Sequence, residues 1–366
     1  MKLLHCADLH LDAKMTSLFT GEMARERKAE LLHTFRRMVE YAVARQVEAV
    51  LVAGDLFDTK HVSAAARHTV LDAIAGHPEI TFFYLKGNHD GDSFPGNLQK
   101  IPDNLKLFGD RWKTYFLGTA GRITVTGVEP FREDGAIPYQ ELSLDGEKFN
   151  IVMLHGQVTL YGTRQDDPYV NLKLLKDKGI DYLALGHVHA YQEAGLDGRG
   201  TYCYPGCLEG RGFDECGEHG FVLLHVDEDS GTCTREFVPF AARTVHVLEV
   251  DITGCRNTPD IGKKIGQALE EASYSSRCML KIVLTGNVDV ECEKNVEILT
   301  QQFAPAYYFL KIQDQSALCV DFHLFAKDES LKGEFVRTVW AADGLGQEEK
   351  AAIIRCGIRA LGGETI

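Results

Sequence analysis

Five short polar motifs, each at or just past the end of an apolar stretch, constrain this chain more than any other feature of its sequence. The motifs are Asp8-Leu9-His10, Gly54–Asp58, Gly87–Asp90, His155-Gly156 and Gly186–His189. The apolar stretches before them are short and rich in Val, Leu and Phe, which is typical of buried strands. Open α/β sheets bind ligands at the carboxyl ends of their strands. We therefore expect the motifs to meet at one edge of a sheet.

The order of the apolar segments predicts an α/β fold. Strand-like runs at residues 2–10, 47–53 and 80–85 alternate with helical periodicity at 31–42 and 62–75. That alternation favours a largely parallel sheet. From there to about residue 240, short strands follow one another through turns containing Gly, Asp or Pro. Many strands with few helices between them indicate a second sheet packed on the first.

The pattern changes after about residue 243. Strands are predicted at 245–252, 278–284 and 306–312, with helices at 260–273 and 296–302, which together form a small α+β unit. Two further helices are predicted at 331–341 and 347–361, the first of them amphipathic.

The charge balance limits how the protein can recognise a partner. Lys and Arg number 39 and Asp and Glu number 53, so the net charge is −14. This argues against binding nucleic acid or an anionic membrane through bulk charge, but a local basic groove or a bound metal could still supply positive charge.

The cysteines and the N-terminus predict a cytoplasmic protein. The 10 cysteines form no CxxC pair, which favours reduced thiols. The N-terminal run Met1–Asp8 reaches a charged residue too soon for a signal peptide, and no apolar run approaches the roughly 20 residues of a membrane span.

The motifs offer seven oxygen and nitrogen ligands for metal ions. They are Asp8, His10, Asp55, Asn88, His155, His187 and His189. Seven ligands exceed the needs of one ion but suit two divalent cations about 3.5–4 Å apart that share one carboxylate. Residues two apart in a strand face the same side, so Asp8 and His10 could reach one ion together. Imidazole and carboxylate ligands without thiolate are compatible with manganese, iron or zinc.

The joint pattern D-x-H, G-D, G-N-H, H and G-H-x-H resembles the calcineurin-like metallophosphoesterase superfamily. Within it, HCADLHLD (5–12), AGDLFDTK (53–60), GNHD and LGHVH (185–189) resemble SbcD- and YhaO-type DNA-repair exonucleases, the bacterial branch of the Mre-type nucleases. The segment PGCLEGRGFDECGEHGF (205–221) resembles the one that follows GHxH in that branch. The resemblance implies a four-layer α-β-β-α sandwich over residues 1–243, a smaller α+β capping domain over 244–328 and a C-terminal helical tail over 329–366.

The resemblance also implies a role for each motif residue. One metal would be bound by Asp8, His10 and His189, the other by Asn88, His155 and His187, and Asp55 would bridge both. A catalytic His89 would donate a proton to the leaving oxygen or stabilise the transition-state charge, and Asp90 would orient its ring.

The implied activity is 3′→5′ exonuclease action on double-stranded DNA in DNA repair, with single-strand endonuclease action as an option. The implied cofactors are two divalent ions, Mn²⁺ before Fe or Zn. The implied partners are DNA, an SbcC- or YhaN-like SMC-type ATPase and a second copy of the chain. The alternative is a metallophosphodiesterase acting on small nucleotides or phosphodiesters. A phosphoprotein phosphatase is disfavoured because GDLFD lacks the Arg of GDxVDRG, and a non-catalytic scaffold because no ligand is missing.

Other residues near the motifs receive ordinary interpretations. Lys60, Lys86, Arg164 and Arg211 could contact phosphate but are interpreted as solvated charges. For Asp58, two interpretations stay open: a carboxylate that contacts a metal-ligating side chain, and an ordinary carboxylate with no role at the site. His5 has the opposite strand parity to Asp8 and His10 and should face away from the metals.

Overall fold

The computed structural model describes residues 1–59, 62–91, 93–96, 100–129, 137–159, 169–290, 292–320 and 325–361. The chain forms two compact units, Met1–Ala242 and Arg243–Ile366. All five motifs lie in the first unit. The division into a nuclease domain, a capping domain and a tail stays a prediction.

Two six-stranded sheets make up most of the first unit. The first has the order β14 (Cys233–Pro239), β13 (Gly220–Val226), β1 (Lys2–Cys6), β2 (Ala49–Ala53), β3 (Thr81–Leu85) and β4 (Leu105–Leu107). The second has the order β11 (Gln192–Gly195), β12 (Thr201–Tyr204), β10 (Tyr182–Gly186), β7 (Phe149–His155), β6 (Ile123–Gly127) and β5 (Lys113–Leu117). Strands β1 to β4 are parallel, as are β6, β7, β10 and β12. A separate pair joins β8 (Gln157–Thr159) to β9 (Tyr169–Asn171).

The apolar core between the sheets explains why they stack. Alternate residues of the central strands, such as Leu3, Leu51, Ile151 and Met153, are fully buried in one cluster. Removing such side chains from water stabilises the fold by roughly 1.5–3 kcal/mol each.

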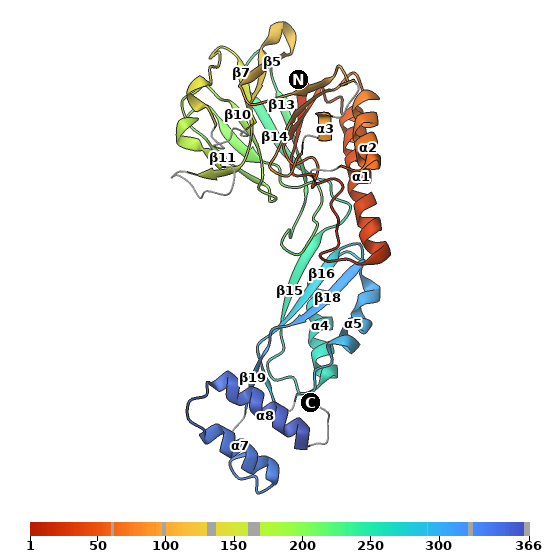
Figure 1. Ribbon diagram of the computed structural model, residues 1–366, viewed down its shortest axis with the longest axis vertical. Helices are drawn as coiled ribbons and strands as arrows, with labels where there is room; N and C mark the ends of the chain where they lie inside the picture. The colour runs from red at the N-terminus through yellow and green to blue at the C-terminus, as the bar shows by residue number, and fades with distance from the viewer. Residues whose placement is uncertain are drawn as a thin grey trace. The chain divides into compact units, whose positions relative to one another are not determined.

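Different elements cover the two outer faces of the sandwich. Helices α1 (Gly21–Ala44) and α2 (Ala64–Ala75) lie side by side on the outer face of the first sheet (Figure 1). Ser63 caps α2 by accepting a hydrogen bond from the Ala66 backbone N–H. The one-turn helix α3 (Ser93–Gly96) follows the third motif. Loops and 3₁₀ helices (η1, Thr119–Gly121; η2, Tyr139–Glu141; η3, Leu172–Leu174) lie around the second sheet, and η2 and η3 contribute to its second apolar cluster. The predicted α/β sandwich is confirmed.

The second unit is built on a parallel sheet in the order β15 (Val245–Asp251), β16 (Met279–Thr285) and β18 (Phe309–Asp314). Its apolar cluster includes buried residues of α4 (Thr258–Ala272) and α5 (Val296–Phe303), followed by a 3₁₀ turn (η4, Ala304–Ala306). A short pair, β17 (Asn287–Asp289) and β19 (Ala317–Cys319), precedes the helices α7 (Leu331–Ala341) and α8 (Gln347–Leu361). Both C-terminal helices are where the periodicity predicts them.

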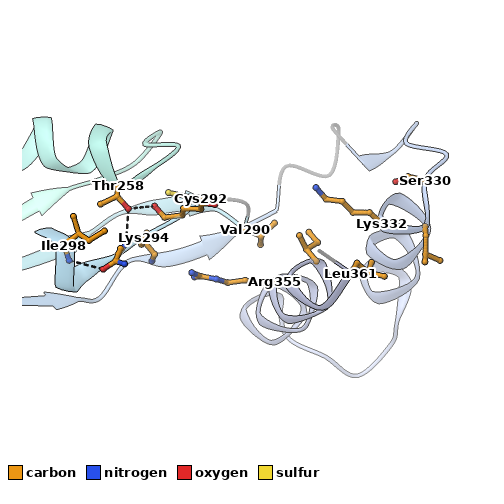
Figure 2. A pocket seen from close by; sticks show the side chains of 13 residues that line it. Thr258, Val290, Cys292, Lys294, Ile298, Ser330, Lys332, Arg355 and Leu361 are labelled. Carbon is orange, nitrogen blue, oxygen red and sulfur yellow. Dashed lines mark hydrogen bonds between the residues drawn. The ribbon is translucent and has the colours of Figure 1, made fainter. Parts of the chain in front are cut away.

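A cavity of about 840 Å³ opens within this second unit (Figure 2). Its lining includes Cys292, Lys294, Lys332 and Arg355, and no described residue of the five motifs contributes to it. In the described part of the chain, no helix combines the length and the apolar character that crossing a bilayer requires.

Candidate metal centre

Motif residues from both sheets lie close together at the carboxyl ends of their strands. Asp8, Asp55 and Asn88 follow the carboxyl ends of the parallel neighbours β1, β2 and β3. His155 ends β7, and His187 directly follows β10, its parallel neighbour in the second sheet. The sequence predicted a single sheet edge, whereas the structure divides these ligands between the carboxyl ends of two sheets, which meet at the site.

Backbone hydrogen bonds lock the motif loops together. The Asp8 N–H donates to the Gly54 carbonyl at 3.0 Å, and the His10 N–H donates to the Asp55 carbonyl at 2.9 Å. Across the sandwich, the His187 N–H donates to the Asp8 carboxylate, with both oxygens at 2.9 Å. The two sheets are thus joined through a carboxylate of the site itself.

Four of the seven candidate ligands have left-handed backbone conformations. The φ angles are +52° at Asp8, +45° at His10, +49° at Asp55 and +103° at His187. Non-glycine residues rarely adopt such angles, and where they do the strain is concentrated at functional sites. This corrects the parity argument: β1 ends at Cys6, so Asp8 and His10 converge through a strained loop rather than along a strand.

The first group of ligands brings the Nε2 atoms of two imidazoles close together, with the rings in an edge-type arrangement. The Nε2 atoms of His10 and His189 lie 3.2 Å apart. Each Nδ1 is bonded to a carboxylate, that of His10 to Asp58 at 3.0 Å and that of His189 to Glu215 at 2.6 Å. Because each Nδ1 donates its proton to a carboxylate, the Nε2 atoms of the two rings direct lone pairs at each other. Two lone pairs 3.2 Å apart repel, so a proton or a cation must lie between these nitrogens. Asp8 lies within the same candidate metal-binding group.

The second group also gathers acceptors. The His155 Nδ1–H donates to the Ala53 carbonyl at 3.0 Å, so its Nε2 faces the Asn88 Oδ1 at 2.9 Å as an acceptor. The His187 Nδ1 lies 3.3 Å from the same oxygen. A cation here could be ligated by the Asn88 Oδ1 and the His155 Nε2 together.

The Asp55 carboxylate lies between the two groups. Its Oδ2 is 3.4 Å from the His155 Nε2 and 3.8 Å from the His10 Nε2. Its Oδ1 accepts the His89 backbone N–H at 2.8 Å, which fixes its orientation. A carboxylate in this position can touch cations in both groups.

The electrostatics of the site favour bound positive charge. Burial raises the pKa of Asp8 to about 6. Burial alone would also raise the pKa of Asp55, but its contact with His155 lowers it below the usual range. Burial alone would lower the pKa of His155, but the Asp55 carboxylate raises it to about 9. Either a proton on His155 or a divalent cation can supply the charge that the buried carboxylates require, so the donor set fits two divalent cations.

The ring of His89 lies beside the first group of ligands and is partly exposed to solvent. Its side chain is 48 % exposed, and its ring packs edge-on against His10 with centroids 5.0 Å apart. The Asp58 Oδ1 is 3.9 Å from its Nδ1. The Asp90 carboxylate instead accepts the backbone N–H groups of Phe57 at 2.9 Å and Gly87 at 3.0 Å. Asp90 thus holds together the second and third motif loops. The carboxylate beside the His89 ring is that of Asp58.

Sequence reasoning missed two residues of this centre. Glu215 was not singled out, and Arg211 was interpreted as a solvated charge, yet both contact the carboxylate–imidazole pairs. Both lie in the 205–221 segment of the resemblance, which was the available signal.

The other basic residues near the motifs have different positions. The Lys86 Nζ lies 3.6 Å from Glu129. Lys60 and Arg164 lie outside the described residues. His5 faces away from the site, as expected, with its Nδ1 2.8 Å from the Tyr182 hydroxyl.

Comparison with known proteins gives one family match and several relatives. The model of the calcineurin-like phosphoesterase family matches residues 1–191, which include all five motifs. The uncharacterized metallophosphoesterase YhaO of Bacillus subtilis (strain 168) is 29% identical over 297 residues, which cover 77% of this chain and 71% of that protein.

Two further relatives are named as DNA-repair or nuclease proteins. The DNA double-strand break repair protein Mre11 of Aeropyrum pernix is 26% identical, over 69% of this chain and 64% of its own length. The SbcD subunit of the nuclease SbcCD of Staphylococcus epidermidis is 25% identical, over 69% of this chain and 73% of its own length. These relatives confirm the resemblance that the motifs indicate. This chain spans just under two thirds of the length of the Mre11 protein.

Proposed function

The chain belongs to the calcineurin-like phosphoesterase family, whose model matches more than half of it, and on that premise we propose that it is a dinuclear-metal nuclease acting on DNA. Family membership makes it a metal-dependent hydrolase of ester bonds. The nucleic-acid substrate, the 3′→5′ polarity on double-stranded DNA and a role in DNA repair are parts of the proposal. The names of two relatives support the DNA substrate and the role in repair. The polarity is proposed from the resemblance of the motifs alone.

One observation carries the proposal: acceptor atoms converge in two groups on either side of the Asp55 carboxylate. In the first group, Asp8, His10 and His189 would hold one divalent cation. In the second group, Asn88, His155 and His187 would hold the other, and Asp55 would contact both. Mn²⁺ is the first candidate that we propose, and the mixed carboxylate, amide and imidazole ligands are equally compatible with iron or zinc.

Two bound divalent cations would neutralise the anionic phosphodiester and lower the pKa of a water molecule for attack on phosphorus. The side chains of the protein supply the remaining functions. Asp58 and Glu215 hold His10 and His189 in the tautomer that leaves Nε2 free to ligate. The buried backbone around Asp8 and Asp55 keeps both carboxylates in place before substrate arrives.

His89 is the proposed catalytic acid. Its ring is half-exposed beside His10, where an incoming phosphodiester could contact it. An imidazole near neutral pH can donate a proton to the leaving oxygen, or donate a hydrogen bond to the charge that develops on phosphate. The Asp58 carboxylate lies 3.9 Å from its Nδ1.

The assembly in which the enzyme works is likewise proposed. One relative is named as a subunit of a nuclease, which supports a partner chain, and we propose from the resemblance that this partner is an SMC-type ATPase. We also propose that the chain acts as a homodimer in the cytoplasm, and that residues 244–328 cap the substrate. With a net charge of −14, cations bound at the site would help to attract a phosphodiester.

Digestion of linear duplex DNA labelled at its 5′ ends tests the substrate and the polarity together. With Mn²⁺, we expect progressively shorter labelled strands, and none with EDTA or with the Asp55→Ala variant. A small chromogenic phosphodiester serves as the parallel substrate. Turnover of that compound without any cleavage of DNA, in the presence and absence of an ATPase partner, would contradict the nuclease and favour the small-phosphodiesterase alternative.

A further inference from the structure

The segment from Pro205 to Phe221 returns to the fifth motif and packs against its backbone. The Cys207 N–H donates to the His189 carbonyl at 3.0 Å. Gly206 has a φ of +77°, and a Cβ there would lie 2.7 Å from that same carbonyl oxygen. The close approach brings the following residues, Arg211 among them, behind the candidate ligands.

The Arg211 guanidinium bonds to two carboxylates at once. Its Nη1 donates to the Asp58 Oδ1 at 3.1 Å, while its Nη2 and Nε donate to the Glu215 Oε1 at 2.8 and 3.2 Å. The Arg211 backbone N–H also donates to the Glu215 Oε2 at 2.7 Å. Only 21 % of the Arg211 side chain is exposed.

These two carboxylates are the ones that orient the facing imidazoles. Asp58 bonds to the His10 Nδ1 and Glu215 to the His189 Nδ1. A continuous chain of contacts therefore runs from His10 through Asp58, Arg211 and Glu215 to His189. It closes at the front, where the two Nε2 atoms lie 3.2 Å apart.

We propose that Arg211 is a positioning residue that holds Asp58 and Glu215 in one arrangement and so sets the directions in which His10 and His189 present Nε2 to a shared divalent cation. The inference rests on the function proposed above, because it assigns both imidazoles to one ion. It concerns one of the two metal positions, since the ligands that Arg211 reaches through its two carboxylates are His10 and His189.

The geometry requires an arginine. A guanidinium is a planar fork whose donors can bond to two carboxylates in fixed directions, whereas a lysine ammonium is a single point charge. Its positive charge also offsets the repulsion between two carboxylates placed behind the same metal position.

Glu215 is fixed from a further side by a buried pair of side chains. The His219 Nε2–H donates to the Glu215 backbone carbonyl at 2.9 Å, so its Nδ1 is an acceptor that faces the Cys207 Sγ at 3.2 Å. Cys207 and His219 are both buried. Glu215 is thus held rigidly enough for Arg211 to transmit a defined geometry to His189.

The competing role for Arg211 is to grip a substrate phosphate. All three nitrogens of its guanidinium already donate to carboxylates within the protein. A phosphate could bond only to the remaining N–H groups on Nη1 and Nη2 unless it displaced Asp58 or Glu215. The contacts therefore favour positioning over substrate binding.

Mn²⁺ titration of the full-length chain tests the proposal, with calorimetry and the electron paramagnetic resonance of free Mn²⁺ as readouts. For Arg211→Ala, we expect one ion to bind about 10–100-fold more weakly than in the wild type and the other to be unchanged. Arg211→Lys should give an intermediate affinity. The matched control is Arg235→Ala, because Arg235 forms a comparable ion pair with Glu193 at 2.7 Å, away from the ligands.

Steady-state kinetics on duplex DNA separate positioning from phosphate binding. We expect the lower kcat of Arg211→Ala to recover at high Mn²⁺ with little change in KM. Wild-type affinity for both ions in Arg211→Ala, or a raised KM that Mn²⁺ does not relieve, would overturn the inference while leaving the proposed function intact. If the wild-type chain bound no second ion, both would be overturned. Should Arg211→Ala not fold, as judged by thermal unfolding in EDTA, Arg211→Lys is held to the same criteria.

Discussion

The Nε2 atoms of His10 and His189 lie 3.2 Å apart while the Nδ1 of each ring is bonded to its own carboxylate. The carboxylates decide which nitrogen carries the proton, and so which nitrogen is free to ligate. Residues far apart in the sequence, Asp58 and Glu215, therefore determine the chemistry of histidines in the first and fifth motifs. The same relationship guides the predictions that concern metal binding.

Replacing Asp55 by alanine should remove metal from both positions. Its Oδ2 lies 3.4 Å from the His155 Nε2 and 3.8 Å from the His10 Nε2, so its loss leaves both groups without the oxygen that they share. A tightly bound ion stabilises the folded state by about 2.7 kcal/mol when its concentration is 100 times the dissociation constant. Mn²⁺ should therefore raise the unfolding temperature of the wild type but hardly that of Asp55→Ala.

Calorimetric titration with Mn²⁺ gives the number of ions bound by each protein. Asp72→Ala is the control, because Asp72 lies on α2, away from the motif loops. Two ions bound to Asp55→Ala with wild-type affinity would contradict the bridging position.

Replacing His89 by alanine should keep both metals and lose most turnover. The ring contacts His10 edge-on, and His89 is not among the ligands proposed for either metal position. Removing a general acid costs about 10²–10⁴-fold in rate. Single-turnover rates on duplex DNA measure the chemical step, and Mn²⁺ titration confirms that the site is intact. A variant with the full single-turnover rate would exclude His89 as the proton donor.

Much of this centre could be predicted from the sequence because its ligands follow apolar strands directly. The strands before Asp55 and Asn88 are runs of Val, Leu and Phe, and their parallel pairing brings the two motifs together. The prediction that these two strands end at the same sheet edge was therefore enough to place Asp55 and Asn88 together.

Other features could not be predicted because they depend on long-range contacts. Asp8 and His10 converge through positive φ angles that hydrogen bonds to the Gly54 and Asp55 carbonyls impose, and no local pattern encodes these bonds. Glu215 lies 26 residues beyond His189 and reaches it only because the 205–221 segment folds back. The role expected for Asp90 was drawn from its neighbour in sequence, whereas its carboxylate bonds to backbone N–H groups.

Replacing Gly186 by alanine should disrupt the contact between the two sheets at the site. A Cβ there would lie 1.9 Å from the Ala53 carbonyl oxygen and 2.8 Å from the His155 Nδ1. The backbone of β2 cannot yield as a flexible side chain would, so we expect a loss of about 1–3 kcal/mol in the free energy of unfolding, together with weaker Mn²⁺ binding.

Urea unfolding and Mn²⁺ titration measure the two effects of the Gly186 substitution. Gly195→Ala is the matched control in the same sheet, because a Cβ at Gly195 meets no atom within 4 Å. Equal stability and equal Mn²⁺ affinity in both variants would show that the sheets can separate there at no cost.

His5 should make the stability of the first unit depend on pH below neutrality. Burial lowers the pKa of His5 to about 3, whereas an unfolded histidine titrates near 6.5. Between these values the unfolded chain binds the extra proton, so stability is fully present above pH 6.5 and is lost as the pH falls toward 3. From pH 7 to pH 5, this one group should lower the free energy of unfolding by about 2 kcal/mol.

Urea unfolding in EDTA at pH 7, 6 and 5 tests this dependence. The free energy of unfolding should fall by about 2 kcal/mol less in His5→Gln than in the wild type. Tyr182→Phe, which removes the hydroxyl 2.8 Å from the His5 Nδ1 but leaves the ring buried, should keep the wild-type dependence. Parallel pH profiles for the wild type and His5→Gln would mean that His5 is protonated in the folded protein or reaches water, and would refute the buried neutral imidazole.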